Sequence, residues 1–150
     1  MANLTDLTSK EFLTELASAA PAPGGGGGAA MAGALAAALS SMVCNLTLGK
    51  EKFAAQEAEV QAVLMKAERA RERLLELVQE DAAVFNSFMS CYKLPKATDE
   101  EKAVRTAAIR AAAKKAAEVP LAIARESFAV LELADELVVC GNPGVITDGA

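Results

Sequence analysis

The chain has 150 residues, of which 53% are hydrophobic, and it carries a net charge of −5. This length favours a single domain, residues 1–150, with one core, and the acidic charge argues against nucleic-acid-binding proteins, which need a basic face for phosphates. We therefore expect small molecules or other protein subunits as partners.

The first predicted helix begins at a capping box. Thr8 is followed three residues later by Glu11, and Leu7 and Phe12 have the spacing of a hydrophobic staple around the same helix start. The helix should end near Ser18, because a proline follows shortly afterwards.

Five consecutive glycines, residues 24–28, stand before a predicted second helix from Ala29 to about Leu48. A glycine run is ordinarily a flexible linker, but this one opens directly onto a helix N-terminus, where free backbone N–H groups suit an anion or a polar ring edge. Small residues that recur at every fourth position predict a closely packed central helix. They are Ala29, Gly33, Ala37 and Ser41.

The stretch from Leu16 to Gly49 contains no charged residue and is long enough to cross a membrane. It consists mostly of Ala and Gly and is interrupted by prolines and polar residues, which gain little from lipid. We therefore expect a buried helix and no membrane span.

A long helix is predicted from Lys50 to Leu94, a stretch without glycine or proline that Pro95 closes. One apolar face follows the spacing of three and four residues that is typical of a buried helix side. The residues of this stripe are Val60, Leu64, Ala67, Leu74, Val78, Phe85, Phe88 and Tyr92.

A second capping box, Thr98 with Glu101, predicts another helix that runs to Glu118. Pro120 should kink or break it, and a further apolar helix, residues 121–139, should follow before a turn-rich tail. No stretch has the alternation of a strand. The sequence therefore predicts an all-α bundle of long antiparallel helices.

The three cysteines, Cys44, Cys91 and Cys140, lie far apart among apolar or small neighbours, which predicts reduced, buried thiols in a cytosolic protein. The chain contains no histidine, so it lacks the means for Ser-His-Asp or Cys-His catalysis and for a histidine-based zinc site. We expect no metal, and in an enzyme Asp, Glu, Lys, Tyr or backbone groups would have to move protons.

Asp81 falls within the apolar stripe, three residues after Val78 and four before Phe85. A carboxylate that faces a core is costly unless it is paired, protonated or placed in a working cleft. Burial would raise its pKa toward the range that is useful for proton transfer. The alternative is a structural aspartate paired with Arg or Lys of a neighbouring helix.

Basic residues gather around the break at Pro95, among them Lys93 and Arg105. Such a cluster is ordinarily a solvated surface, but Lys93 directly follows the apolar stripe and is placed to hold a ligand carboxylate. In the tail, the position of Asn142 after Gly141 indicates a helix cap.

Five blocks of the sequence together resemble the formiminotransferase-cyclodeaminase C-terminal family. They are "FLTELASAAPAPGGGGGAAMAGALAAALSSMVCNLTLGKEKF", "LVQEDAAVFNSFM", "YKLPKATDEEKAVRTAAI", "AAEVPLAIA" and "CGNPGVITD". Their order and spacing match over residues 7–150, which makes the resemblance specific.

The resemblance implies an all-helical homodimer that binds a tetrahydrofolate derivative. It implies ring closure of 5-formiminotetrahydrofolate to 5,10-methenyltetrahydrofolate with release of ammonia or, alternatively, hydrolysis of the methenyl compound to 10-formyltetrahydrofolate. A non-catalytic helical interaction module is a further alternative.

Site residues follow from the same resemblance. Asp81 matches an aspartate that looks like the catalytic acid and base. The expected substrate-binding positions are Gly24, Gly25, Gly26, Lys93, Arg105, Asn142 and Asp148. Lys93 or Arg105 would take the glutamate carboxylate, and the glycine amides with Asp148 would hold the pterin.

Three departures from the family pattern are visible. Gly27 and Gly28 replace a Ser-Val pair, and Gln79 replaces an acidic residue that is common there. Family members also continue into another long helix after the last block, so we expect the domain to lack its C-terminal helix.

Overall fold

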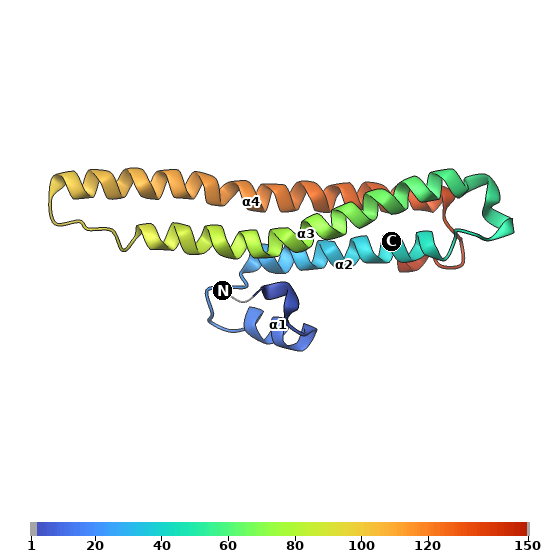
Figure 1. Ribbon diagram of the computed structural model, residues 1–150, viewed down its shortest axis with the longest axis horizontal. Coiled ribbons are helices and arrows are strands. Elements are labelled where there is room, and N and C mark those ends of the chain that lie inside the picture. Colours follow the sequence, from blue (N-terminus) through green and yellow to red (C-terminus); the bar gives the residue numbers. More distant parts are fainter. Residues whose placement is uncertain (1–2, 150) are drawn as a thin grey trace. The chain divides into compact units, whose positions relative to one another are not determined.

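A computed structural model describes residues 3–149, and every regular element in that range is a helix. The four α-helices are labelled in Figure 1. They are α1 (Ser9–Leu16), α2 (Gly25–Asn45), α3 (Glu57–Cys91) and α4 (Asp99–Cys140), with short 3-10 helices at Leu4–Asp6, Glu51–Gln56 and Ile146–Asp148. The predicted all-α class is confirmed.

The helices divide into two compact units. The first unit combines the residues up to Ala29 with Glu76–Ile123, and the second unit combines Ala30–Leu75 with the residues from Ala124 onward. Helices α2, α3 and α4 each contribute a segment to both units.

Within the first unit, α1 starts as predicted. The side-chain oxygen of Thr8 accepts a hydrogen bond from the Glu11 amide at 3.2 Å, and the Glu11 carboxylate accepts one from the Thr8 amide at 2.9 Å. Phe12 is buried behind this cap. The helix ends at Leu16, two residues before the predicted end.

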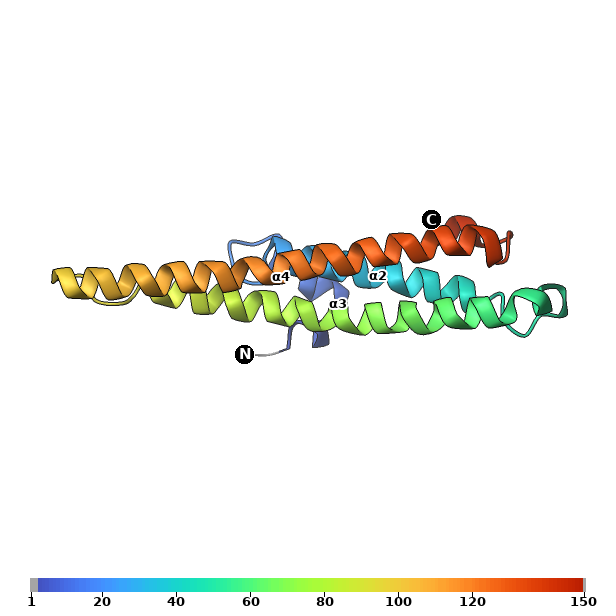
Figure 2. The same ribbon diagram turned by 90° about the horizontal axis from the view of Figure 1, so that it is seen from above.

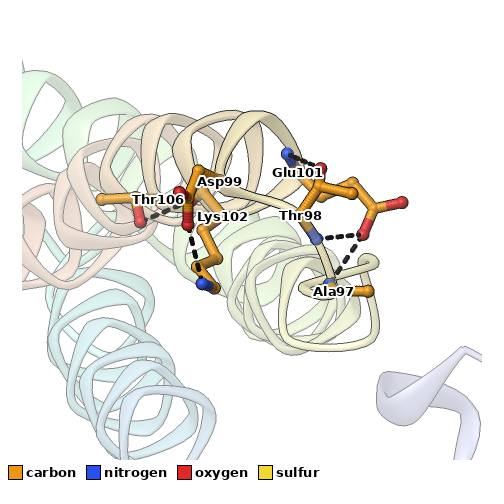
Figure 3. Close-up of polar contacts among 6 residues, drawn as sticks. All are labelled: Ala97, Thr98, Asp99, Glu101, Lys102 and Thr106. Atoms are coloured by element: carbon orange, nitrogen blue, oxygen red, sulfur yellow. Dashed lines mark hydrogen bonds and ion pairs between the residues drawn. The ribbon is translucent and has the colours of Figure 1, made fainter.

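The second predicted capping box is also present. The Glu101 carboxylate accepts hydrogen bonds from the amides of Ala97 and Thr98 at 2.7 and 3.2 Å, and the Thr98 hydroxyl oxygen accepts one from the Glu101 amide at 3.1 Å, as Figure 3 shows. Lys102 pairs with Asp99 at 2.8 Å on the exposed surface. These contacts start α4 directly after the turn that ends α3, so the two helices run antiparallel in this unit (Figure 1).

The prediction was a kink or a break at Pro120, and the break does not occur. The helix continues from Asp99 to Cys140 with Pro120 inside it. Proline removes one backbone donor, but Val119 and Ile123 on either side are buried, and their packing offsets the lost hydrogen bond.

The long helix that was expected from Lys50 begins seven residues later, at Glu57. Gly49 adopts a φ of +70°, a left-handed conformation that favours glycine. The 3-10 turn that follows contains Phe53 in a non-helical conformation, with a φ of −115°. A propensity for helix therefore did not suffice to extend α3 back to Lys50.

The second unit holds a core built from α2, α3 and α4, whose segments lie side by side in both views (Figures 1 and 2). Cys44 and Cys140 belong to this core, and burial raises the pKa of the Cys44 thiol to about 11. All three cysteines are free, but Cys91 is only partly buried, which corrects its prediction. The core residues are Val43, Cys44, Val60, Val63, Ala67, Leu133, Leu137 and Cys140.

The close packing that was predicted for α2 occurs in this unit. A Cβ atom at Gly33 would lie 3.2 Å from Leu74 and 2.7 Å from the Ser127 hydroxyl. Ala37 and Ser41 are buried on the same helix. In the described range, α2 is the one helix long and apolar enough to cross a membrane, and half of its apolar window is buried inside the structure.

Candidate active site

Asp81 lies on α3 in the first unit, at the N-terminus of α2. The backbone N–H of Gly27 donates a hydrogen bond to its Oδ2 atom at 3.0 Å. The first amides of a helix have no partner within the helix and carry partial positive charge, so a carboxylate is stabilised there. The side chain is half-buried, and it lies beside the glycine run.

The glycine run is helical, which corrects the prediction that it precedes the helix as a cradle. α2 begins at Gly25, so Gly25–Gly28 form its first turn. Glycine inside a helix costs about 1 kcal/mol relative to alanine, and close packing explains why it is used. Gly27 is buried next to Pro23 and Val78.

Gly26 has no room for a side chain. A Cβ atom there would lie 2.6 Å from the carboxyl carbon of Asp81 and 2.8 Å from its Oδ2 atom, closer than real Cβ contacts. At Gly25 a Cβ atom would meet nothing within 4 Å, and at Gly24 it would stay 3.8 Å from Asp81. Within the predicted triplet, therefore, Gly26 is the residue whose size sets the approach of α2 to the carboxylate.

A cavity of about 260 Å³ adjoins this contact within the first unit. Among its described lining residues, Asp81 is the only charged side chain and Phe85 the only aromatic one. Three apolar residues from other segments complete the wall. The lining consists of Pro21, Gly24, Gly25, Gly26, Asp81, Ala82, Val84, Phe85, Ala116 and Pro120.

Pro120 belongs to the lining of this cavity. Because proline has no N–H, it donates no helical hydrogen bond to the Ala116 carbonyl, one turn earlier on α4. Ala116 and Pro120 both line the cavity. The sequence predicted a kink or a break at this proline, whereas in the structure Pro120 stays within α4 and lines the cavity.

Lys93 lies in the turn after α3 and Arg105 lies near the start of α4, and neither lines the cavity. The Arg105 guanidinium donates a hydrogen bond to the Tyr92 carbonyl at 3.4 Å and lies 5.5 Å from the centroid of the Tyr92 ring. Lys93 is exposed. The helical rise from Asp81 to the end of α3 is about 15 Å, which separates these cations from the carboxylate.

Asn142 has structural partners in the second unit. Its backbone N–H donates to the Thr47 hydroxyl at 3.0 Å, its side-chain amide donates to the Leu46 carbonyl at 3.3 Å, and its side-chain oxygen accepts from Gly144 at 3.0 Å. These bonds join the end of α4 to the end of α2. Asp148 is exposed in the last 3-10 helix, and a substrate-binding role for either residue stays a prediction.

The departures noted in the sequence have structural counterparts. Where the family has serine, Gly27 supplies the amide that binds Asp81. Gly28 faces Leu16, and a Cβ atom there would lie 3.1 Å from it. The side-chain oxygen of Gln79, two residues before Asp81, accepts a hydrogen bond from the Leu4 amide at 3.0 Å and anchors the N-terminal segment to α3.

Sequence reasoning missed several of the cavity residues. Phe85 was assigned to a buried stripe, although its spacing of four residues from Asp81 is the signal that places both on one helix face. Pro21 and Ala116 gave no signal, because only the packing of their segments brings them to the cavity. No group of three or more Cys, Asp or Glu side chains suited to a metal occurs within residues 3–149, and the expectation of no metal stays a prediction.

Comparisons with known proteins agree with the sequence resemblance. The family model described as formiminotransferase-cyclodeaminase matches residues 8–150. Over 141 residues the chain is 50% identical to a methenyltetrahydrofolate cyclohydrolase of Methylorubrum extorquens. The aligned region covers 94% of this chain and 68% of the relative. It is 34% identical over 146 residues to the formimidoyltransferase-cyclodeaminase of Rattus norvegicus, and this aligned region covers 97% of this chain and 27% of the relative.

A solved structure is also similar. The crystal structure of formiminotetrahydrofolate cyclodeaminase from Thermotoga maritima superimposes with a TM-score of 0.83 at 30% sequence identity, and the match covers 97% of this chain and 69% of that one. The chain spans about a quarter of the rat relative and about two thirds of the two bacterial ones. By sequence, motif order and fold, the chain belongs to the formiminotransferase-cyclodeaminase family.

Proposed function

We propose that the chain is an enzyme of folate one-carbon metabolism that hydrolyses 5,10-methenyltetrahydrofolate to 10-formyltetrahydrofolate. The observation that carries this proposal is the Asp81 carboxylate, held by the Gly27 amide at 3.0 Å beside an otherwise apolar cavity. Support from the comparisons is the 50% identity to a methenyltetrahydrofolate cyclohydrolase.

The charge of the substrate suits this cavity. The methenyl bridge is a cation shared between N5, the bridging carbon and N10, and a carboxylate close to it is attractive where apolar walls weaken solvent screening. The Gly27 amide donates a hydrogen bond to the Oδ2 atom of Asp81. The carboxylate is therefore oriented before substrate binds, which is how preorganised groups lower a barrier.

Asp81 acts as both base and acid in the proposed reaction. Its carboxylate takes a proton from water as the water oxygen bonds to the bridging carbon, which yields a tetrahedral carbinolamine. Asp81 then returns that proton to N5 as the carbon–N5 bond breaks. The remaining hydroxyl proton leaves to solvent as the formyl C=O forms on N10, so the reaction consumes one water and releases one proton.

Cyclodeamination of 5-formiminotetrahydrofolate is the second candidate, and the similarity to the Thermotoga cyclodeaminase structure favours it. In this reaction N10 attacks the carbon of the protonated formimino group, whose nitrogen becomes an amino group, and Asp81 receives the N10 proton. Asp81 then protonates the departing amino group, which leaves as ammonia. Both candidates pass through the same carbon centre, so a single carboxylate serves either one.

The turn between α3 and α4 offers a place for the glutamate end of the substrate. We propose that Lys93 or Arg105 binds its carboxylate there, while Gly24, Gly25 and Gly26 border the reacting part. The exposed amino group of Lys93 supports this assignment. The Arg105 guanidinium is already positioned over Tyr92, which fixes its direction at little further entropic cost. Asn142 and Asp148 remain proposed pterin contacts.

A homodimer is proposed as the assembly, without nucleic-acid or membrane partners. Large apolar side chains remain exposed on α2 and α4, including Leu35 and Leu131 at 65% and 66%. Such surfaces mark contacts between subunits. Sedimentation at micromolar concentration tests this assembly, and a purely monomeric species would contradict it. The free cysteines support a cytosolic location.

Two assays on the purified chain separate the candidates. Methenyltetrahydrofolate is supplied at neutral pH, and its absorbance decay is compared with the uncatalysed rate. In parallel, 5-formiminotetrahydrofolate is supplied and ammonia is measured. Acceleration of the first reaction without ammonia release in the second supports the cyclohydrolase, and the reverse result assigns the cyclodeaminase. If neither reaction is accelerated and the chain binds no folate, the result would support the alternative of a non-catalytic helical interaction module.

A further inference from the structure

Phe85 is exposed at a position where its helix spacing predicts burial. It follows Val78 by seven residues and Asp81 by four on α3, and Val78 and Ala82 are at most 2% exposed. Phe85 itself is 39% exposed. The apolar stripe therefore opens at Phe85, and the cavity that Asp81 lines is found there.

The remaining walls favour a flat apolar group next to Phe85. Pro21, Ala116 and Pro120 line the same cavity and carry no charged or hydrogen-bonding side chain. Among the described lining residues, only the Asp81 side chain and backbone groups can make polar contacts with a ligand. A ligand in this space should therefore place a reacting polar atom at Asp81 and an aromatic ring beside Phe85.

The structure of the substrate determines which ring this is, and this step rests on the proposed function. N10 of tetrahydrofolate is bonded directly to the benzene ring of the p-aminobenzoyl group, whereas N5 belongs to the pterin. Residues four apart on a helix have Cβ atoms about 5 to 6 Å apart, and paired aromatic rings have centroids about 4.5 to 7 Å apart. A ring attached to an atom at Asp81 therefore reaches Phe85.

We propose that Phe85 is the binding platform for the p-aminobenzoyl ring of the folate substrate. Its role is to bind the ring to which N10 is attached, and it takes no part in proton transfer. Phe85 is thus a determinant of affinity for one identifiable part of the substrate. This proposal also orients the substrate, because the pterin must then lie on the far side of Asp81 from Phe85.

Two fragments of the substrate test the proposal by competition and calorimetric titration. p-Aminobenzoylglutamate contains the ring assigned to Phe85, and 6-methyltetrahydropterin contains only the pterin. Phe85→Leu should weaken p-aminobenzoylglutamate binding about 3- to 10-fold, the range expected for loss of an aromatic pair. Binding of 6-methyltetrahydropterin should stay within about twofold, and Phe85→Tyr should restore the affinity for p-aminobenzoylglutamate.

Phe128→Leu is the matched control. Phe128 is an exposed phenylalanine of the second unit, 61% accessible, and it does not line the cavity. It should bind both fragments like wild type. In turnover with the folate substrate, Phe85→Leu should raise KM by a similar factor and leave kcat within about twofold, since ring binding is equal in the ground and transition states.

Several results would overturn the assignment. Equal weakening of both fragments by Phe85→Leu, or no weakening of either, would show that Phe85 does not bind the benzoyl ring. Wild-type binding of the pterin fragment without the benzoyl fragment would remove this proposal and leave the proposed function intact. Binding of neither fragment, together with no turnover of either folate, would remove both.

Discussion

The two units use the same three long helices in different ways. In the second unit, apolar side chains such as Val43, Val60 and Leu137 are almost completely buried, and the core contains no charged residue among those described. In the first unit, Asp81 and Phe85 are left partly open beside a cavity. A helical domain can thus bury apolar side chains in one set of contacts and keep a carboxylate partly exposed in another.

Small residues also serve different purposes in the two parts of α2. In the second unit, Gly33 and Ala37 let the helices pack closely. In the first unit, Gly26 and Gly27 let the helix N-terminus approach a carboxylate. The first purpose affects folding, and under the proposed function the second affects chemistry, so substitutions in the two regions should have separable consequences.

The largest expected effect is loss of stability in the second unit. Leu137→Ala removes a side chain that is 1% exposed and should lower the free energy of unfolding by about 2 to 5 kcal/mol. Leu13→Ala, at a position 62% exposed on α1, should change it by less than about 0.5 kcal/mol. Urea titration followed by circular dichroism measures both. Equal effects would mean that the second unit does not carry the stability assigned to it.

Asp81→Asn should lower activity and leave stability nearly unchanged. Turnover of the folate substrate should fall about 10²-fold or more, because the amide cannot exchange a proton, while the midpoint of thermal unfolding changes little. Asp135→Asn, an exposed acid on α4, is the control and should retain activity. Steady-state kinetics with the preferred substrate provide the measurement. Near-normal turnover in Asp81→Asn would remove Asp81 from the mechanism.

Gly26→Ala and Gly25→Ala form a matched pair on the first turn of α2. A Cβ atom at Gly26 collides with the Asp81 carboxyl group and must displace it, whereas one at Gly25 meets open space. Turnover should fall about 10-fold or more in Gly26→Ala, since small displacements of catalytic groups are costly. Gly25→Ala should leave the Asp81 carboxyl group in place and gain up to about 1 kcal/mol of stability, which thermal unfolding measures. Wild-type turnover in Gly26→Ala would contradict the steric role of Gly26.

The smallest expected effect concerns the buried thiol of Cys44. Burial, followed by the nearby Cys140, raises the pKa of this thiol from 9.0 to about 11. Above pH 9 the thiol ionises more readily in the unfolded chain than in the folded one, so stability is retained below pH 9 and declines as the pH rises toward 11. In Cys44→Ala this decline should be shallower. Thermal unfolding midpoints measured at pH 8, 9 and 10 test it, and unchanged slopes would contradict it.

Local patterns predicted much of this structure. The capping boxes at Thr8 and Thr98 begin their helices through the expected hydrogen bonds, because a capping box depends only on residues close in sequence. Asp81 was placed on the inward face of α3 for a similar reason, since its neighbours along the helix are apolar. The order of the motifs along the chain was sufficient to indicate the family.

Other features depended on partners distant in sequence. The glycines are helical because Asp81, Val78 and Leu16 pack against them, and no local propensity contains this information. Pro120 remains within α4 because the buried residues around it hold the helix together. Tertiary packing outweighed local preference in both cases.

The sequence by itself determined the helical class, the two capped helix starts and the acidic residue on an apolar face, because each depends on periodicity or on neighbours within one or two turns. Only the tertiary structure decided that the Gly27 amide holds Asp81, that Gly26 must lack a side chain and that Phe85 stays open beside them. Those properties arise where segments more than fifty residues apart pack together, and the free energy of such contacts is not encoded in either segment alone.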